Sequence, residues 1–461
     1  MLQIIIFAIV SIAAFGYAGF QFAKIRRNIL LGKDEVLELD RGQSIRNVFL
    51  VAFGQKKMFK RIIPAVLHLF IYVAFLFTQI ELIEILIDGF FGVHRFFADK
   101  IGLLYTITIS FIEILSVLAF VGTVVFILRR NVIKIPRLAS LKGWAKLDGN
   151  LILVFEILLL IGIFSMNGAD TVLQKLDPAH YPDTGRLAVS SWLGPALFGG
   201  LEQGTLQIIE RFGWWLHIIM VFVFLNYLPK SKHLHILLAF PNTFYAKQEE
   251  KAEIENMPEV MKEVKSMMGL DGSDPFADNG GDPMEEELPD FGADDVFTLS
   301  WRNILSAYTC TECGRCTSVC PANQTGKKLS PRKILMDVRD RAEEVGKNLD
   351  SGNPEFIRAD LRGQGVKLSK ENYDDGKSLF DYVSREELHA CTTCMACVEA
   401  CPVLINPLDP ILKMRRYEIL TESAGPSDWL PMFNSIENSG SAWQIPKDRD
   451  SWAKEAVETV G

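Results

Sequence analysis

Long apolar runs alternate with polar segments through the first half of the chain. A helix that spans a bilayer needs about 20 predominantly apolar residues, and five stretches qualify, the last two being short. The predicted spanning helices cover residues 2–23, 62–87, 103–128, 149–166 and 214–228. After residue 240 the chain is polar, with acidic stretches. We therefore expect an all-α protein, in which a five-helix transmembrane bundle (1–240) precedes a cytoplasmic α-helical domain.

Basic residues gather at alternate ends of these helices, whereas the loops near 88–102 and 167–213 are poorer in them. The clustered residues are Lys24, Arg26, Arg27, Lys56, Lys57, Lys60, Arg61, Arg129, Arg130, Lys134, Arg137, Lys142, Lys146, Lys230 and Lys232. Because cytoplasmic loops carry the excess of Lys and Arg, the N-terminus is expected outside the cytoplasmic membrane of a bacterium, with Trp214 and Trp215 at the outer interface. The first apolar run, 2–23, is long, and basic residues follow it rather than precede it. This order is typical of a helix that stays in the membrane rather than of a cleaved signal peptide.

Net charge is −8, which gives no indication of nucleic-acid binding. Residues 241–296 form a predicted acidic linker that includes the run Glu285, Glu286 and Glu287. This segment is interpreted either as a solvated tether or as an acidic docking strip for a basic partner. A ferredoxin-like domain over 297–425 and a tail over 426–461 complete the predicted organisation.

All eight cysteines belong to two copies of the pattern C-x2-C-x2-C-x3-C-P. This is the run of bacterial two-cluster ferredoxins, in which the fourth cysteine ligates the other cluster. One [4Fe–4S] cluster is thus expected on Cys310, Cys313, Cys316 and Cys401, and the other on Cys391, Cys394, Cys397 and Cys320. Structural zinc usually uses paired CxxC units, and disulfides are rare in cytoplasmic segments, so both alternatives are weak. The helical patterns around the motifs favour an α-helical ferredoxin domain.

Four of the seven histidines are candidate haem b ligands: His68, His217, His233 and His235. A haem between helices needs two imidazoles at the same depth, a condition that His68 meets with either His235 or His233. His217 and His235 are ~27 Å apart along a helix and cannot share a haem. An outer haem on His217 would need a partner, and the nearest candidate by depth, His94, lies in a loop. One haem is therefore favoured over two, and the alternative role for His68 is a buried polar contact.

Two carboxylates, Glu113 and Glu156, lie in the middle of predicted spans. Ionisable groups in hydrocarbon usually face a cavity or a partner, and quinone reduction consumes two protons with two electrons. Glu113 and Glu156 are therefore candidates for proton handling, with hydrogen-bonded packing as the equal alternative. Glu81 and Glu84 are expected near the outer interface.

Two segments resemble known families. The segment WWLHIIMVFVFLNYLPKSKHLHILLAFPN at 214–242 resembles the last helix of the nitrate reductase γ-type cytochrome b, which implies that His217 and His235 are haem ligands. That family has two ligands ten residues apart on helix two, where this chain has His68 and then Thr78. Residues 301–339 and the tail residues resemble membrane-bound iron–sulfur oxidoreductases related to heterodisulfide reductase. The tail residues are Asn434, Glu437, Asn438, Trp443, Arg449 and Trp452.

Some members of that group oxidise electron-transfer flavoprotein (ETF) and reduce menaquinone, so the resemblance implies both partners. Full-length relatives continue into cysteine-rich CCG domains, whereas no cysteine follows Cys401 in this sequence. A CCG-domain iron–sulfur subunit is therefore an expected partner. The leading hypothesis is an oxidoreductase subunit that passes electrons from ETF to menaquinone. The alternatives are quinol-dependent reduction of a disulfide-type acceptor and a non-redox membrane anchor.

Overall fold

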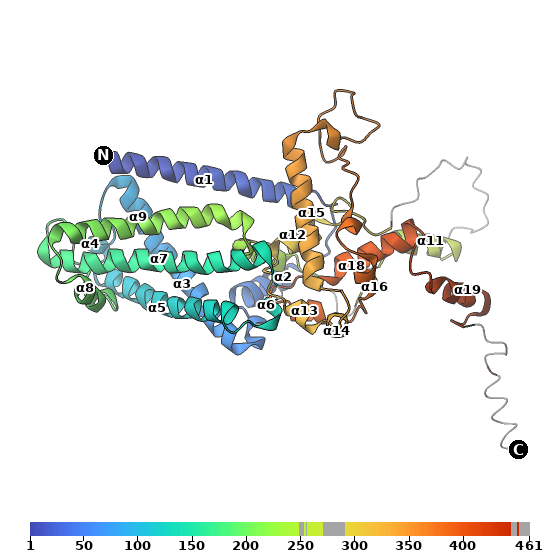
Figure 1. The fold of residues 1–461 in the computed structure, drawn as a ribbon, viewed down its shortest axis with the longest axis horizontal. Helices are drawn as coiled ribbons and strands as arrows, with labels where there is room; N and C mark the ends of the chain where they lie inside the picture. The colour runs from blue at the N-terminus through green and yellow to red at the C-terminus, as the bar shows by residue number, and fades with distance from the viewer. Residues whose placement is uncertain (140, 249–252, 255, 271–290, 444–449, 451–461) are drawn as a thin grey trace, which may run out of the picture. The chain divides into compact units, whose positions relative to one another are not determined.

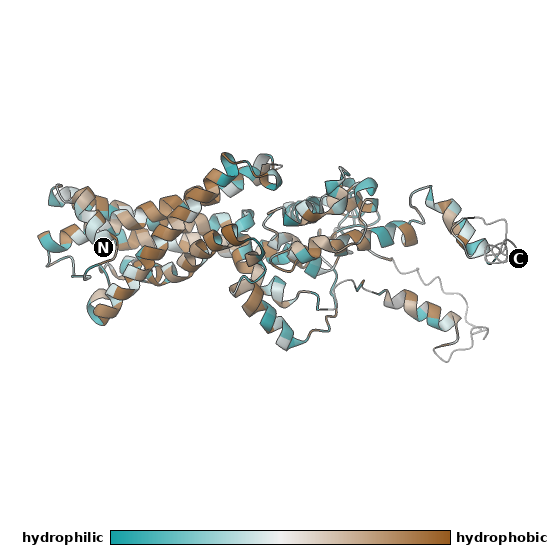
Figure 2. Ribbon diagram, turned by 90° about the horizontal axis from the view of Figure 1, so that it is seen from below, coloured by the Kyte–Doolittle hydropathy of each residue, from teal (hydrophilic) through white to brown (hydrophobic). Residues whose placement is uncertain are grey.

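A computed structural model describes residues 1–139, 141–248, 253–254, 256–270, 291–443 and 450. Five helices are long and apolar enough to cross a membrane, which confirms the prediction of five spans. They are α1 (Leu2–Ile29), α3 (Ile62–Phe91), α5 (Leu103–Asn131), α7 (Gly143–Leu176) and α9 (Gln203–Tyr227). These helices pack along one another as a bundle (Figure 1). Their ribbons are mainly apolar, unlike the mixed colouring of the other helices (Figure 2).

Two of these helices are longer than the apolar pattern indicated. α7 extends beyond 149–166 at both ends, and α9 begins at Gln203 rather than near 214. Polar side chains such as Asp170 and Glu210 interrupt the apolar runs, although both are buried in the bundle. Trp214 consequently lies inside α9, is 6% exposed and packs against Phe7, with ring centroids 5.4 Å apart. The predicted start of this helix near 214 was wrong, because the polar first turns of α9 hid its beginning.

Small residues allow close packing inside the bundle. A Cβ atom added at Gly162 of α7 would lie 3.0 Å from His217, and one at Gly213 of α9 would lie 2.6 Å from the backbone of Met166. In membranes, such small residues let helix backbones approach closely. The α7–α9 pair is therefore closely packed, with His217 against Gly162.

Short helices connect the spans or follow the last one. These are α2 (Arg41–Asn47), η1 (Val48–Phe53), η2 (Met58–Lys60), α4 (Ala98–Ile101), α6 (Pro136–Ala139), α8 (Ser190–Phe198), η3 (Leu228–Lys230), η4 (Lys232–Leu234) and α10 (His235–Phe244). α10 continues past residue 241, where the acidic linker was expected to begin, and Asn242 within it donates a hydrogen bond to the carbonyl oxygen of Val403 (2.8 Å).

The cysteine-containing domain (residues 295–410) belongs to the same compact unit as residues 1–254. Its helices are α12 (Trp301–Thr309), α13 (Arg315–Val319), α14 (Pro321–Gln324), α15 (Pro331–Ser351), η5 (Pro354–Phe356), η6 (Leu379–Asp381), α16 (Arg385–His389) and α17 (Ala396–Ala400). Serine side chains cap α12, α15 and α16 by accepting backbone N–H bonds. Only isolated β-bridges occur among the described residues, so the predicted all-α class is confirmed.

A second unit comprises residues 255–294 and 411–461. It contains α11 (Pro258–Met267), most of α18 (Leu408–Arg416), η7 (Tyr417–Thr421) and α19 (Trp429–Ser439). Within it, the backbone N–H of Ala293 donates to the carbonyl oxygen of Lys413 (3.0 Å). The acidic run 285–287 and the tail residues Arg449 and Trp452 lie outside the described residues.

The cysteine-containing domain is joined directly to the end of α1. Lys33 pairs with residues 299–301 through two backbone hydrogen bonds, of 2.8 and 3.1 Å, and Asn28 donates to the hydroxyl of Tyr308 (3.0 Å). Gly32 permits this approach, because a Cβ there would lie 2.6 Å from the backbone nitrogen of Trp301. The two halves of the chain are therefore packed as one body rather than tethered.

We expect Gly32→Ala to weaken this junction, because the added methyl group meets backbone that cannot move aside. Overpacking of this kind costs about 1–3 kcal/mol, so thermal unfolding in detergent should begin several degrees lower. Gly16→Ala is the matched control, since nothing lies within 4 Å of its added Cβ. Equal melting temperatures for the two variants would contradict the rigid junction.

Candidate functional site

The first cysteine motif and the last cysteine of the second motif surround one cavity. Its lining includes Cys310, Cys313, Cys316 and Cys401, the four residues expected to share a cluster. The loop between α12 and α13 supplies the first two, α13 supplies Cys316, and Cys401 follows α17. Burial raises the pKa of the Cys310 thiol, and the nearby thiols of Cys316, Cys313 and Cys401 raise it further.

The other four cysteines lie around the contact between α13 and α17. Burial raises the pKa of Cys397 to about 12, with further contributions from Cys316, Cys391 and Cys320. Cys394 is exposed. The arrangement thus brings Cys320 of the first motif beside Cys391 and Cys397 of the second, as the crossed ligand assignment requires.

The two motifs repeat the same backbone conformation. The second residue after the first cysteine has a positive φ in both loops, 53° at Glu312 and 55° at Thr393. So does the fourth residue, with 70° at Gly314 and 56° at Met395. Left-handed residues are uncommon outside glycine, and their recurrence shows that each loop curls in the same way.

The described side chains contain no group of three or more metal-binding residues that converges on a single ion.

Three of the predicted haem ligands form a cluster at the end of the bundle that faces the cysteine-containing domain. The ring centroids of His68 and His235 are 6.4 Å apart, and those of His233 and His235 are 5.4 Å apart. His68 comes from the second turn of α3, and the other two come from η4 and the start of α10. Burial lowers the pKa of His233 and His235, so both are neutral at pH 7 and able to bind a metal.

In both His68 and His235, one ring nitrogen already has a hydrogen-bond partner. Nδ1 of His68 lies 3.1 Å from Oε1 of Gln55, and Nδ1 of His235 lies 3.0 Å from the carbonyl oxygen of Lys232. Hydrogen bonds of this kind fix the tautomer and orientation of metal-binding imidazoles. They leave Nε2 of both rings for another partner.

Asp148 holds the turn that carries these histidines. The hydroxyl groups of Tyr227 and Ser231 donate to its Oδ1 (2.5 and 2.8 Å), and the backbone N–H of Lys232 donates to Oδ2 (3.1 Å). Sequence reasoning missed both Asp148 and Gln55. Asp148 could have been noticed in the sequence as a carboxylate directly beside a predicted apolar span. Nothing in the sequence distinguished Gln55.

His217 lies apart from the three-histidine cluster. Its Nδ1 donates to the carbonyl oxygen of Leu159 (3.0 Å) on α7. Its suggested partner, His94, is bound elsewhere, with Nε2 2.8 Å from Asp170 and its ring packed against Tyr181. The structure therefore provides no contact between His217 and His94.

The intramembrane carboxylates have different surroundings. Glu113 accepts hydrogen bonds from the backbone N–H groups of Val189 (2.7 Å) and Ser190 (3.1 Å), at the start of α8. This contact favours a packing role, because the carboxylate satisfies the free N–H groups of a helix end. Glu156 has no hydrogen-bond partner among the described residues.

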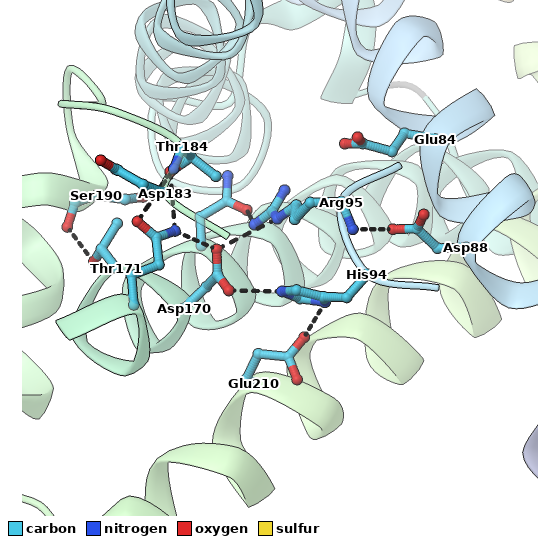
Figure 3. A network of polar contacts seen from close by, with 12 residues as sticks. Glu84, Asp88, His94, Arg95, Asp170, Thr171, Asp183, Thr184, Ser190 and Glu210 are labelled. Carbon is cyan, nitrogen blue, oxygen red and sulfur yellow. Dashed lines mark hydrogen bonds and ion pairs between the residues drawn. The ribbon is translucent and has the colours of Figure 1, made fainter. Parts of the chain in front are cut away.

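A buried ionic network occupies the end of the bundle away from the histidine cluster (Figure 3). Arg95 is 4% exposed and lies 3.4 Å from Asp170 and 3.8 Å from Glu81. It also donates to Asn167 (2.6 Å). Glu84 accepts from the hydroxyl of Tyr105 (2.7 Å). Glu81 and Glu84 are thus interior residues that join α3 to its neighbours.

Basic side chains connect the cysteine loops to the bundle. Arg315 of α13 donates to the carbonyl oxygen of Lys57 (3.4 Å), and Arg137 of α6 donates to the carbonyl oxygen of Cys313 (3.1 Å). Lys232 bonds to Glu312 (3.2 Å), inside the first motif. The first cysteine loop and the histidine turn are therefore direct neighbours.

Residues 309–405 match the family model of the 4Fe-4S dicluster domain. The chain is 27% identical over 450 residues to the probable iron-sulfur-binding oxidoreductase FadF of Bacillus subtilis. It is 25% identical over 460 residues to the EtfAB:quinone oxidoreductase of Syntrophomonas wolfei. These alignments cover 93% and 96% of this chain, and 58% of each relative.

A third relative, the probable membrane-anchored ferredoxin of Chromohalobacter salexigens, is 31% identical over 163 residues, which cover 35% of this chain and 24% of that protein. No solved structure matches the chain significantly. The relatives point to the class of iron–sulfur electron-transfer oxidoreductases with a membrane attachment. The chain spans little more than half the length of the first two.

Removal of the guanidinium of Arg95 should destabilise the bundle strongly. Arg95→Met leaves the buried carboxylates of Asp170 and Glu81 without their cation, and breaking a buried ion pair costs about 3–5 kcal/mol. Thermal unfolding in detergent measures the loss, with the exposed Lys100→Met as control. The double variant Arg95→Met/Asp170→Asn should recover part of it. Melting at the wild-type temperature would show that the network contributes little to stability.

Proposed function

We propose that this chain is the membrane electron-transfer subunit of a quinone-linked oxidoreductase. Electrons enter from a cytoplasmic donor, ETF acting through a CCG-domain iron–sulfur subunit. They pass through two [4Fe–4S] clusters and a haem b to menaquinone in the bilayer of a bacterial inner membrane. The observation that carries the proposal is the packing of the first cysteine loop against the turn that holds His235, through Lys232 and Glu312.

The cysteines fit two [4Fe–4S] clusters. Cys310, Cys313, Cys316 and Cys401 line one cavity, and Cys391, Cys394, Cys397 and Cys320 belong to the second set. Backbone N–H groups already point at two of the thiols, from Thr393 to Cys391 and from Ile405 to Cys401, each at 3.4 Å. Hydrogen bonds to cluster sulfurs tune the reduction potential, so these loops supply both ligands and tuning groups.

His68 and His235 would hold a haem b. Their ring centroids are 6.4 Å apart, a separation at which both imidazoles could bind one metal ion through metal–nitrogen bonds of about 2 Å. Gln55 and the carbonyl oxygen of Lys232 orient the two rings. His233 is the alternative ligand. The separate position of His217 supports one haem rather than two.

When bound, the clusters and the haem supply one-electron redox chemistry, and reduction of the quinone takes up two electrons and two protons. The residues of this chain hold the binding sites for these groups in place. The cysteine loops would hold the clusters beside α13 and α17, Asp148 fixes the histidine turn, and Arg315 joins the first loop to Lys57, ahead of α3. Glu156, with no protein partner among the described residues, is the better of the two carboxylate candidates for moving a proton.

The names of two relatives support the choice of partners. One is called an EtfAB:quinone oxidoreductase, and another a membrane-anchored ferredoxin. The basic helix ends lie on the side of the cysteine-containing domain, as Arg137 and Lys232 illustrate. A cytoplasmic location of that domain accords with the preference of basic residues for the cytoplasmic side.

The haem is tested by the optical spectrum of dithionite-reduced minus air-oxidised protein. We expect a b-type α-band in the wild type that is lost in His68→Ala and in His235→Ala, because each variant would remove one of the two imidazoles that hold the haem. His180→Ala is the matched control, since His180 is exposed and pairs with Asp177, away from His68 and His235. A wild type without the band, or a band retained in both ligand variants, would contradict this haem site.

The clusters are tested by Cys313→Ser and Cys394→Ser. Each change removes a thiolate ligand from one cluster, so iron content and the EPR signal of the reduced protein should fall by about half. Electron transfer from the cytoplasmic donor to a menaquinone analogue should fall at least tenfold. Thr311→Ser and Thr392→Ser, beside the same cysteines, serve as controls. Undiminished quinone reduction in the cysteine variants would refute the proposed function.

A further inference from the structure

The connection between the first two spanning helices, residues 41–63, combines apolar side chains with basic ones and contains no Asp or Glu. Its basic residues are Arg41, Arg46, Lys56, Lys57, Lys60 and Arg61. The first part is a continuous helix over residues 41–53, made of α2 and η1, and η2 follows it. A segment that was expected to be a basic loop is therefore a folded, strongly positive helix.

One face of the helix 41–53 is apolar and exposed. Ile45, Phe49 and Phe53 follow one another at intervals of four residues, so they lie on the same side of the helix. They are 49%, 62% and 42% exposed, and the rings of Phe49 and Phe53 are stacked with their centroids 5.7 Å apart. Ser44 and Val51, seven residues apart on another face, are buried. The helix is thus amphipathic, with its apolar face turned away from the protein.

This apolar face continues into the exposed surface of a spanning helix. Phe59 of η2 is 41% exposed, and Ile62 and Ile63, the first residues of α3, are each 70% exposed. α3 is one of the five helices that are long and apolar enough to cross a membrane. Because only the short segment 54–61 separates the two helices, the helix 41–53 lies at the level where α3 enters the bilayer.

The other side of the helix is fixed to the protein. The side-chain amide of Gln248 donates to the hydroxyl of Ser44 (2.8 Å). The ring of Phe53 packs against Phe240 of α10, with the centroids 4.7 Å apart. These contacts hold the helix in one orientation, so that the face with Ile45 and Phe49 is presented in a defined direction.

The charges of the segment indicate which surface covers this face. Arg41, Arg46, Lys56 and Arg61 are exposed and form no ion pair with a described residue. Helices with Lys and Arg beside a face of Phe, Leu or similar residues lie in membrane interfaces, and anionic headgroups attract basic segments next to a span. A second copy of this chain is a poor occupant, because pairing of the two identical faces would bring their positive charges together.

We propose that residues 41–61 form an interfacial anchor. The apolar face of the helix 41–53 enters the leaflet on the side of the cysteine-containing domain, and the basic residues bind the headgroups of anionic phospholipids such as phosphatidylglycerol. This inference goes beyond the proposed function and does not depend on it.

The interfacial anchor ends beside two parts of the candidate site. Gln55 is buried and lies 3.1 Å from Nδ1 of His68. The carbonyl oxygen of Lys57 accepts a hydrogen bond from Arg315 of α13 (3.4 Å). Attachment of the anchor to lipid therefore also holds the support of His68 and a support of the first cysteine loop in place.

The first experiment identifies what contacts the apolar face, in wild-type holoprotein in nanodiscs of phosphatidylcholine and phosphatidylglycerol. A trace of phosphatidylglycerol with a diazirine near the carbonyl end of one acyl chain is photolysed, and labelled peptides are identified by mass spectrometry. We expect labels in 45–53 as well as at the start of α3, and none in the exposed loop 361–366. Labels on the spanning helices without any in 45–53 would overturn the proposal, whether a second copy or water covers that face.

The second experiment tests the apolar contact. The double variant Ile45→Gln/Phe49→Gln should reduce the label in the interfacial anchor at least about threefold, because amide side chains are unfavourable below the headgroups. Val366→Gln, at an exposed apolar position of the cysteine-containing domain, is the matched control and should leave the label unchanged. Equal helix content by circular dichroism excludes misfolding. A label of wild-type intensity in the double variant would contradict insertion of this face.

The third experiment tests the preference for anionic lipid, with photoactivatable phosphatidylglycerol and phosphatidylcholine in equal amounts. The wild type should be labelled preferentially by phosphatidylglycerol, and Arg41→Gln/Arg46→Gln/Lys56→Gln should lose at least about threefold of this preference. High salt should weaken the preference of the wild type as well.

The control for charge is Lys347→Gln/Lys367→Gln/Lys370→Gln, which removes three positive charges from exposed positions of the cysteine-containing domain. It should keep the lipid preference of the wild type. Equal labelling of the wild type by the two lipids, or a preference that the anchor variant retains, would overturn the assignment of anionic phospholipid as the ligand.

Discussion

The buried carboxylate of Asp148 is the constraint on which the candidate electron pathway depends. It accepts hydrogen bonds from Tyr227, Ser231 and the backbone of Lys232, and so fixes the turn between α9 and α10. That turn presents His235 to His68, while the side chain of Lys232 reaches Glu312 in the first cysteine loop. One carboxylate thus sets the position of a candidate haem ligand relative to a candidate cluster. Electron transfer requires such fixed proximity, which a flexible tether would not provide.

Buried charged groups have different roles at the two ends of the bundle. At the end near the cysteine-containing domain, ionic groups hold neighbouring elements in register. At the other end, carboxylates and polar side chains from α3, α5 and α7 surround Arg95 (Figure 3). This network links the three helices to one another. A buried charge is tolerated only with partners. This explains why α7 and α9 continue through sequence that does not look apolar.

The cysteine motifs and the five spans were predictable because each depends on local sequence alone: ligand spacing in one case and apolar length in the other. That His68 lies close to His235 and His233 was also predictable, since helix depth can be counted along the chain. The full lengths of α7 and α9 were not, because Asp170 and Glu210 are buried only by virtue of partners on other helices. The roles of Gln55 and Asp148 arise from tertiary contacts between distant segments, and local patterns cannot reveal them.

Flash photoreduction of the purified protein by a water-soluble sensitiser tests the central claim most directly, namely that the cysteine-containing domain and the bundle form one electron pathway. The absorbance of the clusters and the α-band of the haem are followed in time after a single flash. The account predicts that the clusters are reduced first and that the haem is then reduced at the rate at which the clusters are reoxidised. Haem reduction that is independent of the clusters, or reduced clusters that never pass electrons to the haem, would contradict it.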